Sequence, residues 1–307
     1  MAENRNAQQV REITDKLEQG IKELFESEKF KEYLTTMSKF YNYSFNNTLL
    51  IAMQKPDATL IAGYTSWQRN FDRHVMKGEK GIKILAPAPY KAQEEREKID
   101  PATQKPVLDA DGKPVTETVE VMRPAFKVVS VFDVSQTDGK ELPDIAVDEL
   151  TGSVENYAAF FEALKQESPV PISFEDIPGG AKGYFSHVEN RIAIQDGMSE
   201  IQTVKTAIHE IAHAKLHTIK PDEKVAPEER KDRHTKEVEA ESVAYTVCQR
   251  YGIETSDYSF GYIAGWSSDK DTKELKGSLE TIRSTAAEMI ESIDAKLKGL
   301  LAEKSQE

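Results

Sequence analysis

The sequence has a single cysteine, Cys248, among its 307 residues. One thiol cannot form a disulfide within the chain, which excludes the class of small disulfide-stabilised secreted proteins and predicts a reducing, cytoplasmic environment. Cys248 lies in the apolar segment AYTVCQRY, so we interpret it as a buried structural thiol and not as a nucleophile.

Long apolar runs are also absent. No stretch of about 18 consecutive apolar residues occurs, so we expect no membrane-spanning helix and no membrane partner. The N-terminal segment MAENRNAQQVREITDKLEQG lacks the apolar core of a secretory signal, and we therefore expect no export signal. With 38% hydrophobic and 30% charged residues, the composition predicts a globular chain large enough for two domains.

Positive charge is in deficit, since the formal net charge is −13. A uniformly acidic surface would repel a phosphate backbone, which argues against a general nucleic-acid binder. The window from Lys55 to Lys91 differs, because it holds seven Lys or Arg against three acidic residues. Binding depends on local charge more than on the total, so this basic window leaves a local nucleic-acid surface open.

The first half of the chain predicts helices followed by strands. A helical apolar stripe runs through REITDKLEQGIKELF, and YNYSFNNTLLIAMQKP predicts a helix that stops near Pro56. The polar segment 91–120 contains the turn signal Asp111-Gly112 and is interpreted as an exposed excursion or long hairpin. Strands are predicted at 82–87 and within AFKVVSVFDVSQT, with a linker over 137–150.

The second half predicts a helix, a small sheet and three further helices. ENYAAFFEALKQE is helical, VPISFED is a short strand, and AKGYFSHVENRIAI is a hairpin that bends at Glu189-Asn190. We expect the strand around Arg191–Ile194 to form an edge on which an extended peptide could lie. Helices are predicted over 199–217, in KEVEAESVAYTVCQRYG up to Gly252, and as a long amphipathic tail over 271–303.

The most informative motif is HEIAH, inside the helix predicted over 199–217. His209 and His213 are four residues apart and therefore project from the same face of a helix. Two imidazoles so placed can bind one Zn²⁺, each at about 2.0–2.1 Å. Glu210 lies beside the first histidine, where it can act on water as a general base without binding the metal. The spacing predicts a zinc site of the kind that hydrolyses amides.

A zinc site of this kind needs a third protein ligand, and the helix KEVEAESVAY offers three glutamates. Glu237 and Glu241 share one face, whereas Glu239 points roughly away from it. We favour Glu237 as the ligand and Glu241 as the group that orients a histidine from behind, with the reverse left open. His217, one turn further along the HEIAH helix, could support a ligand from behind, and His234, just before the ligand helix, could approach a substrate. For each we favour an ordinary surface histidine.

Two family likenesses follow from these motifs. Residues 200–250 resemble the metallopeptidase domains of ImmA/IrrE-type and ArdC-type proteins, in which HExxH precedes a helix bearing an E-x-x-x-[N/E/D] pair. Residues from about 8 to 136 resemble the N-terminal single-stranded-DNA-binding domain of ArdC-type antirestriction proteins. The shared features there are Asn46-Asn47 before an apolar helix, GYTSW, KGEKGIKILAP and VFDVSQT.

The resemblance implies an α+β protein with two domains. Residues 1–140 would form a mixed α/β domain that binds single-stranded DNA, and residues 141–307 a zincin-like metallopeptidase domain with a long C-terminal helix. Such a protein belongs to a mobile genetic element, a plasmid or phage, and protects incoming single-stranded DNA from restriction.

Single-strand binding requires a basic groove with aromatic stacking platforms. Aromatic and basic residues are interleaved between residues 41 and 83, with Tyr64 among the aromatics. The residues predicted to contact nucleic acid are Tyr43, Asn46, Trp67, Arg69, Arg73, Lys77, Lys80 and Lys83.

Two alternatives remain at this point. The chain could be a regulatory zinc metallopeptidase that cleaves a repressor or host protein, with an N-terminal domain that recruits protein instead of DNA. It could also be a binding module whose zinc is structural, although a structural site has no need for Glu210 beside its first ligand.

Overall fold

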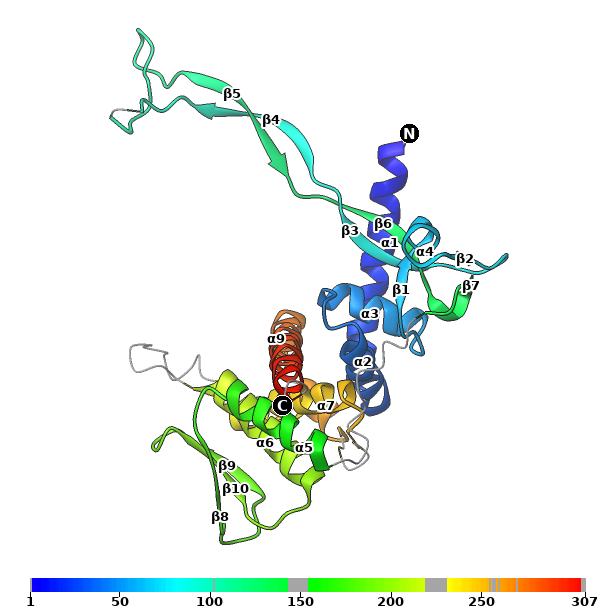
Figure 1. Ribbon diagram of the computed structural model, residues 1–307. Coiled ribbons are helices and arrows are strands. Elements are labelled where there is room, and N and C mark those ends of the chain that lie inside the picture. The colour runs from blue at the N-terminus through cyan, green and yellow to red at the C-terminus, as the bar shows by residue number, and fades with distance from the viewer. Residues whose placement is uncertain are drawn as a thin grey trace. The chain divides into compact units, whose positions relative to one another are not determined.

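A computed structural model describes most of the chain (Figure 1). The described residues are 2–101, 103–142, 154–218, 231–253, 255, 258, 260–268 and 270–304. The chain divides into two compact units. The hairpin unit comprises residues 1–16 and 83–130, and the main unit comprises residues 17–82 and 131–307. The predicted domain boundary near residue 140 adjoins residues 143–153, which lie outside the described part, so it stays a prediction.

A two-stranded antiparallel ribbon dominates the hairpin unit. Strand β4 (Tyr90–Glu97) pairs along its length with strand β5 (Thr116–Arg123). Charged residues join the strands, as where Lys91 lies 2.7 Å from Glu120. Most side chains on both faces of this ribbon are polar and exposed. The expectation of a long exposed hairpin over 91–120 is therefore confirmed (Figure 1).

One helix and two strands run through both units. They are α1 (Ala2–Leu24), β3 (Ile82–Pro87) and β6 (Phe126–Asp133). The predicted apolar stripe of α1 is buried at every fourth or third position, because these positions share one helical face. The predicted strand over 82–87 is confirmed at the same bounds.

The N-terminal part of the main unit combines short helices with two small sheets. Strand β6 is the central strand of one sheet, between β3 and β1 (Ile61–Gly63), and β2 (Arg73–Val75) pairs with β7 (Thr137–Gly139) in the other. Ser44 caps α3, since its side chain accepts a hydrogen bond from the backbone N–H of Asn47. The elements are α2 (Ser27–Lys39), α3 (Phe45–Gln54), β1 (Ile61–Gly63), α4 (Tyr64–Phe71), β2 (Arg73–Val75), the 3₁₀ turn η1 (Val134–Gln136) and β7 (Thr137–Gly139).

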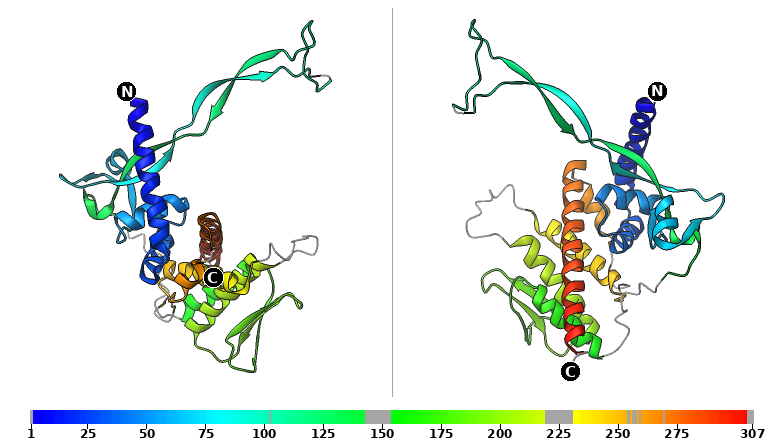
Figure 2. Two further views of the ribbon diagram at one scale, coloured as in Figure 1. Left: turned by 180° about the vertical axis from the view of Figure 1, so that it is seen from behind. Right: turned by 45° about the horizontal axis from the view of Figure 1, so that its top comes forward.

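The C-terminal part of the main unit places a three-stranded sheet on a layer of helices (Figure 2). The sheet order is β8-β10-β9, with β10 parallel to β8 and antiparallel to β9. Its elements are α5 (Val154–Glu167), β8 (Ile172–Glu175), β9 (Gly183–Ser186), β10 (Arg191–Gln195), α6 (Glu200–His217), α7 (Arg233–Arg250), α8 (Ile263–Ser267) and α9 (Thr272–Lys304).

The sheet order corrects one expectation. The strand that contains Arg191–Ile194 is β10, which is bonded on both sides and therefore cannot be an edge. The reason is that β8, which precedes the hairpin in the chain, pairs with the second hairpin strand, β10. The local pattern of the hairpin does not reveal this pairing. Among the described residues, β9 is the edge strand beside α6.

The core of the main unit lies where α6, α7 and α9 pack together. Helix α9 packs along α5 and α7 and buries Leu279, Ile282, Met289 and Ile293, so the predicted packing role of the long tail is confirmed (Figure 2). Cys248 is fully buried there, as expected for a structural thiol. Within the described part of the chain, none of the helices combines the length and the apolar content that a membrane crossing requires.

Candidate metal centre and nucleic-acid surface

Helix α6 carries the HEIAH motif and is held by a cap at its first turn and by buried residues on its inward face. The Ser199 side chain caps its first turn by accepting a hydrogen bond from the backbone N–H of Gln202. Ile208 and Ile211 are fully buried on the inward face. Because His209 and His213 lie four residues apart, this anchoring holds both imidazoles on another common face, toward α7.

The two histidines and Glu237 of α7 converge on one point. The Nε2 atoms of His209 and His213 are 3.0 Å apart. The Oε2 atom of Glu237 lies 3.7 Å from His209 Nε2 and 3.4 Å from His213 Nε2. Among the described residues, these three form the only group of potential metal-ligating side chains whose donor atoms all lie within 4.8 Å of one another.

These distances fit a zinc ion. Tetrahedral ligands at about 2.0–2.1 Å from a common ion lie roughly 3.3 Å from each other. The observed spacings of 3.0, 3.4 and 3.7 Å bracket that value. Two imidazole nitrogens and a carboxylate are also a donor set that zinc accepts, with a fourth position left for water or substrate. The structure thus brings the predicted ligands together, and their occupancy by zinc stays a prediction.

The electrostatics of the cluster favour a cation. The adjacent imidazoles of His209 and His213 hold the pKa of Glu237 far below its usual range. Burial opposes protonation of His209, but the adjacent Glu237 and the further charges of Glu210 and Glu241 raise its pKa overall. The cluster is therefore rich in negative charge that a bound cation would compensate.

Glu210 is held between the two histidines and the sheet. Burial raises its pKa, because the charged carboxylate is poorly solvated there. The carboxylate also accepts a hydrogen bond from the backbone of Phe185 on β9. Glu210 is thus positioned next to the ligand cluster without belonging to it, as the motif predicts for a general base.

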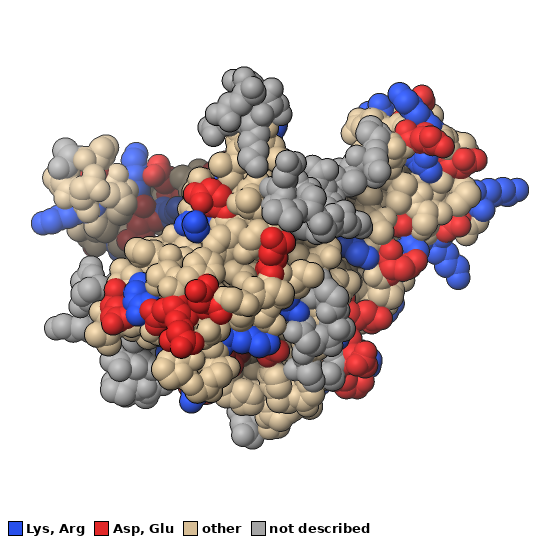
Figure 3. All heavy atoms as spheres, turned by 60° about the horizontal axis from the view of Figure 1, so that its bottom comes forward, with Lys and Arg blue, Asp and Glu red and all other residues tan. Residues whose placement is uncertain are grey.

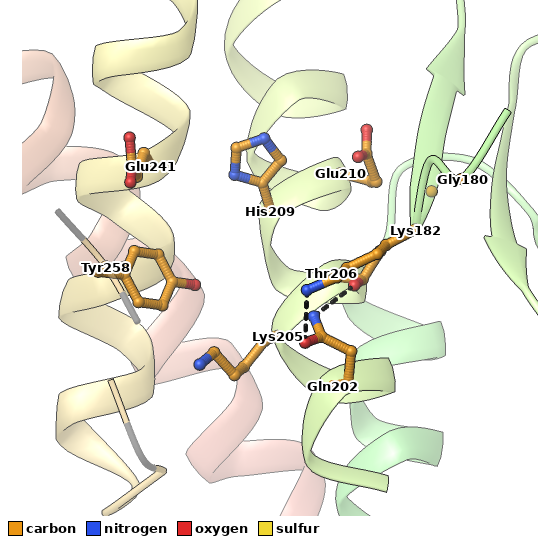
Figure 4. A pocket seen from close by; sticks show the side chains of 10 residues that line it. Gly180, Lys182, Gln202, Lys205, Thr206, His209, Glu210, Glu241 and Tyr258 are labelled. Atoms are coloured by element: carbon orange, nitrogen blue, oxygen red, sulfur yellow. Dashed lines mark hydrogen bonds between the residues drawn. The ribbon is translucent and has the colours of Figure 1, made fainter. Parts of the chain in front are cut away.

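Two cavities meet at this centre. One, of about 450 Å³, is lined by Lys182, Lys205 and Glu241 among others. The second, of about 540 Å³, extends past His187 and Glu237. Both are bounded by Gly183, His209 and Glu210, so open space lies on either side of the centre. Figure 4 shows the first cavity, with Glu241 on α7 facing His209 on α6.

The predicted role of Glu241 as an orienting group stays a prediction. Its carboxylate accepts a hydrogen bond from the hydroxyl of Tyr262 and lines the first cavity.

The structure corrects the interpretation of His217 as a surface histidine. His217 is 5% exposed, and its Nδ1 lies 3.1 Å from Nδ1 of His213. Its Nε2 lies 3.2 Å from Glu239, which is fully buried. Glu239 does leave the face of Glu237, as expected, but it points into the core and reaches the metal cluster through His217. The i, i+4 spacing of His217 from His213 pointed to the alternative position, behind a ligand. His234, in contrast, is exposed as expected.

The residues predicted to contact nucleic acid fall into different environments. In the main unit Asn46, Arg69, Lys77 and Lys80 are exposed and Tyr43 is half-buried. Lys83, in the hairpin unit, is exposed and donates to the Ser130 hydroxyl over 2.6 Å. On the face that Figure 3 shows, basic side chains are scattered among acidic ones without one continuous basic patch.

Trp67 and Arg73, two of the residues predicted to contact nucleic acid, make their main contacts within the protein. Trp67 is fully buried and its indole N–H donates to the backbone oxygen of Phe132 over 2.9 Å, so it cannot stack on a base. The reason is that Trp67 points toward β6 and its ring packs against Phe71 of the same helix. Arg73 donates to the backbone oxygens of Thr137 and Lys140 over 2.8 and 2.6 Å, which makes it a tie between β2 and the residues around β7.

The exposed aromatic on this helix is Tyr64 instead, with 58% of its surface accessible. Lys77 and Lys80 lie on a loop that is ordered by Gln136, whose amide donates to Glu79 and to the backbone oxygen of Lys80, both over 2.9 Å. The backbone N–H of Met76 in turn donates to the backbone oxygen of Gln136. The two lysines are thus presented to solvent from a fixed loop.

A family model for the N-terminal domain of anti-restriction factor ArdC matches residues 4–132. The match gives residues 4–132 an ArdC-type N-terminal domain and does not extend to the rest of the chain. The matched segment coincides closely with the one, from about 8 to 136, in which the sequence resembles this family, so that resemblance is confirmed.

The chain is also similar to larger proteins. An uncharacterized protein of Bacillus anthracis is 31% identical over 329 residues, covering 97% of the chain and 54% of the relative. DNA primase TraC of Escherichia coli is 31% identical over 166 residues, covering 50% of the chain and 14% of TraC. The chain therefore spans about half the length of the first relative and a small part of the second.

The solved structures that the chain matches include two of the antirestriction ArdC protein from the R388 plasmid. The metal-free structure is 22% identical, with a TM-score of 0.49, and the match covers 85% of this chain and 86% of that one. The Mn(II)-bound structure is 19% identical with the same TM-score of 0.49, and covers 83% and 85%.

Proposed function

We propose that this ArdC-type protein serves antirestriction for a mobile genetic element, binding single-stranded DNA through its N-terminal domain and Zn²⁺ through His209, His213 and Glu237. The observation that carries the proposal is the joining of an ArdC domain to a convergent His-His-Glu cluster with Glu210 beside it. The similarity to a protein named DNA primase, TraC, also supports an association with DNA.

The DNA-binding half of the proposal rests on exposed basic and aromatic side chains. Arg69, Lys77 and Lys80 are accessible, and the loop of the two lysines is ordered. Tyr64 offers a flat face on the same part of the chain. Such a combination binds single strands with little sequence preference, because phosphates meet the cations while bases stack on the ring.

The second half is a hydrolytic centre of the peptidase kind. Bound zinc supplies Lewis-acid chemistry for attack of water on a carbonyl. Glu210 takes a proton from the attacking water and passes it to the leaving amine. The edge strand β9 can pair with an extended polypeptide, and the cavities on either side of Glu210 leave room for chain on both sides of the cleaved bond.

The same room on both sides of the centre also fits a second candidate function, a regulatory metallopeptidase that cleaves a repressor or host protein. In that case the N-terminal domain recruits protein, and single-stranded DNA has no specific affinity for the chain. Oligonucleotide binding separates the two functions.

The test combines metal analysis and oligonucleotide binding on one purified sample, with and without a chelator. We expect one zinc ion per chain, absent from His213→Ala, and salt-dependent binding of a single-stranded oligonucleotide. Replacing both Lys77 and Lys80 by Ala should weaken that binding and lower the salt slope by about 0.7 for each phosphate that is no longer neutralised.

The matched control replaces two exposed lysines of α9, Lys273 and Lys298, and therefore removes the same charge elsewhere. Equal reductions of affinity in the two double variants would show that only net charge matters and would refute the placement of the DNA surface. Absence of stoichiometric metal in the unaltered protein would refute the zinc site.

A further inference from the structure

His213 uses both of its ring nitrogens. Its Nε2 faces His209 and Glu237, as a metal ligand would. Its Nδ1 lies on the other side of the ring, 3.1 Å from Nδ1 of His217. A neutral imidazole carries one proton, so an Nε2 that is free to bind a cation requires the proton on Nδ1. His213 must then donate this proton to His217.

His217 can accept it, because its own proton is fixed elsewhere. Its Nε2 lies 3.2 Å from an Oε2 of Glu239, and an ionised carboxylate can only accept hydrogen bonds. The proton of His217 therefore belongs on Nε2, which leaves Nδ1 as an acceptor toward His213. The position of the carboxylate at the end of this hydrogen-bond chain thus determines both tautomers.

Glu239 is itself held from several elements. Lys231 donates to both of its oxygens, over 2.6 and 2.8 Å, and thereby keeps the carboxylate paired with a cation. Ser278 of α9 contributes a further side-chain hydrogen bond. The side chains of His217 and Glu239 are 2% and 0% exposed, so water competes little for these bonds.

We propose that His217 and Glu239 are positioning residues that hold the ring and tautomer of His213 so that Nε2 faces the metal. The inference deepens the proposed function, since it rests on a metal site at His209, His213 and Glu237. It gives a second glutamate of α7, two residues before Glu241, an orienting role at the site. The long helix α9 gains a part in the site through Ser278.

The physical benefit is preorganisation. A ligand whose ring and tautomer are already set loses less freedom when the ion binds, and partners of this kind typically change metal affinity about 10–100-fold. Only His213 would be supported in this way through His217, so the effect is specific to one of the two histidine ligands.

The first test measures zinc affinity by competition with a chromophoric chelator. His217→Phe keeps a ring of similar size but removes both nitrogens, and should lower the affinity about 10–100-fold. Ile293→Ala, a fully buried change on α9 outside the hydrogen-bond chain, controls for reduced stability and should leave affinity nearly unchanged. Wild-type affinity in His217→Phe, or an equal reduction in Ile293→Ala, would overturn the proposal.

The second test needs no variant and no metal. Long-range ¹H–¹⁵N spectra of the metal-free protein report which imidazole nitrogen carries the proton. We expect His213 protonated at Nδ1 and His217 at Nε2. A proton at Nδ1 of His217 would overturn the proposal even if the protein binds zinc. If the unaltered protein binds no zinc but shows these tautomers, the metal site fails while the hydrogen-bond chain stands.

Discussion

His209, His213 and Glu237 lie on two packed helices, whereas Lys77 and Lys80 lie on an exposed loop between short strands. The helices hold three donor atoms within 4.8 Å of each other, a geometry that one displaced side chain destroys. The loop presents charges to solvent, where binding adds up over several weak contacts. Replacing one residue of the metal cluster should therefore abolish metal binding. Replacing one lysine of the loop should lower DNA affinity by a limited amount.

The largest expected effect is at Glu210. Glu210→Gln keeps the size of the side chain but cannot accept a proton, so hydrolysis of a peptide substrate should fall by about 10²–10⁴-fold. Zinc content should not change, because Glu210 is outside the ligand cluster. Cleavage of a fluorogenic peptide library, with zinc measured on the same sample, checks both. Glu200→Gln, an exposed change on the same helix, is the control. Unaltered cleavage by Glu210→Gln would refute the general-base role. It would also show that a single change at the metal centre need not abolish activity.

Two aromatic residues of α4, near the loop in sequence, separate an effect on stability from an effect on DNA binding. Trp67→Ala should destabilise the protein by about 3–5 kcal/mol, because it empties a fully buried site. Tyr64→Ala should change stability by only about 0.5 kcal/mol, because the ring is exposed. It should weaken oligonucleotide binding by about 1–3 kcal/mol if a base stacks on it.

Chemical denaturation and oligonucleotide titration of both variants provide the measurement. Trp67→Phe, which keeps a ring in the core, serves to check that removal of the indole by itself does not affect DNA binding. Full oligonucleotide affinity in Tyr64→Ala would contradict the proposed stacking position.

A smaller effect is expected at Glu167, in the scaffold behind the metal cluster. Lys215 and Lys296 lie 2.7 and 2.6 Å from its two oxygens. Burial by itself would raise the pKa of Glu167, but these two cations hold it below its ordinary value of 4.5. The folded state thus favours the ionised form, so the stabilisation is present above the unfolded pKa and is lost as pH falls through the folded pKa.

Glu167→Gln should accordingly destabilise the protein by about 2 kcal/mol near neutral pH, less than a fully enclosed pair because both lysines remain partly solvated. The difference from the unaltered protein should shrink as pH falls below 4.5. Urea denaturation at a series of pH values measures it. A difference that stays constant down to about pH 3 would show that the carboxylate is not the source. Glu162→Gln, on the exposed side of α5, is the control.

Much of the fold follows from local patterns. Strand β3, the ribbon over 91–120, helix α6 and the packing of α9 were all predictable, because turn signals and periodic apolar residues act over a few positions. The edge of the C-terminal sheet was not, since β8 pairs with β10 across residues that are distant in sequence. Likewise nothing local distinguishes Trp67 from Tyr64 three residues earlier. Both side chains contact Phe132 of β6, but only Trp67 is enclosed on all sides.

The sequence by itself determined that His209 and His213 face the same way with Glu210 beside them, because helical geometry is set by spacing alone. It also narrowed the third ligand to one short helix. Only the tertiary structure decided that Glu237 meets the histidines and that Glu239 reaches them through His217. Those relations depend on how α6 and α7 pack, and packing is settled by contacts between segments that are far apart along the chain.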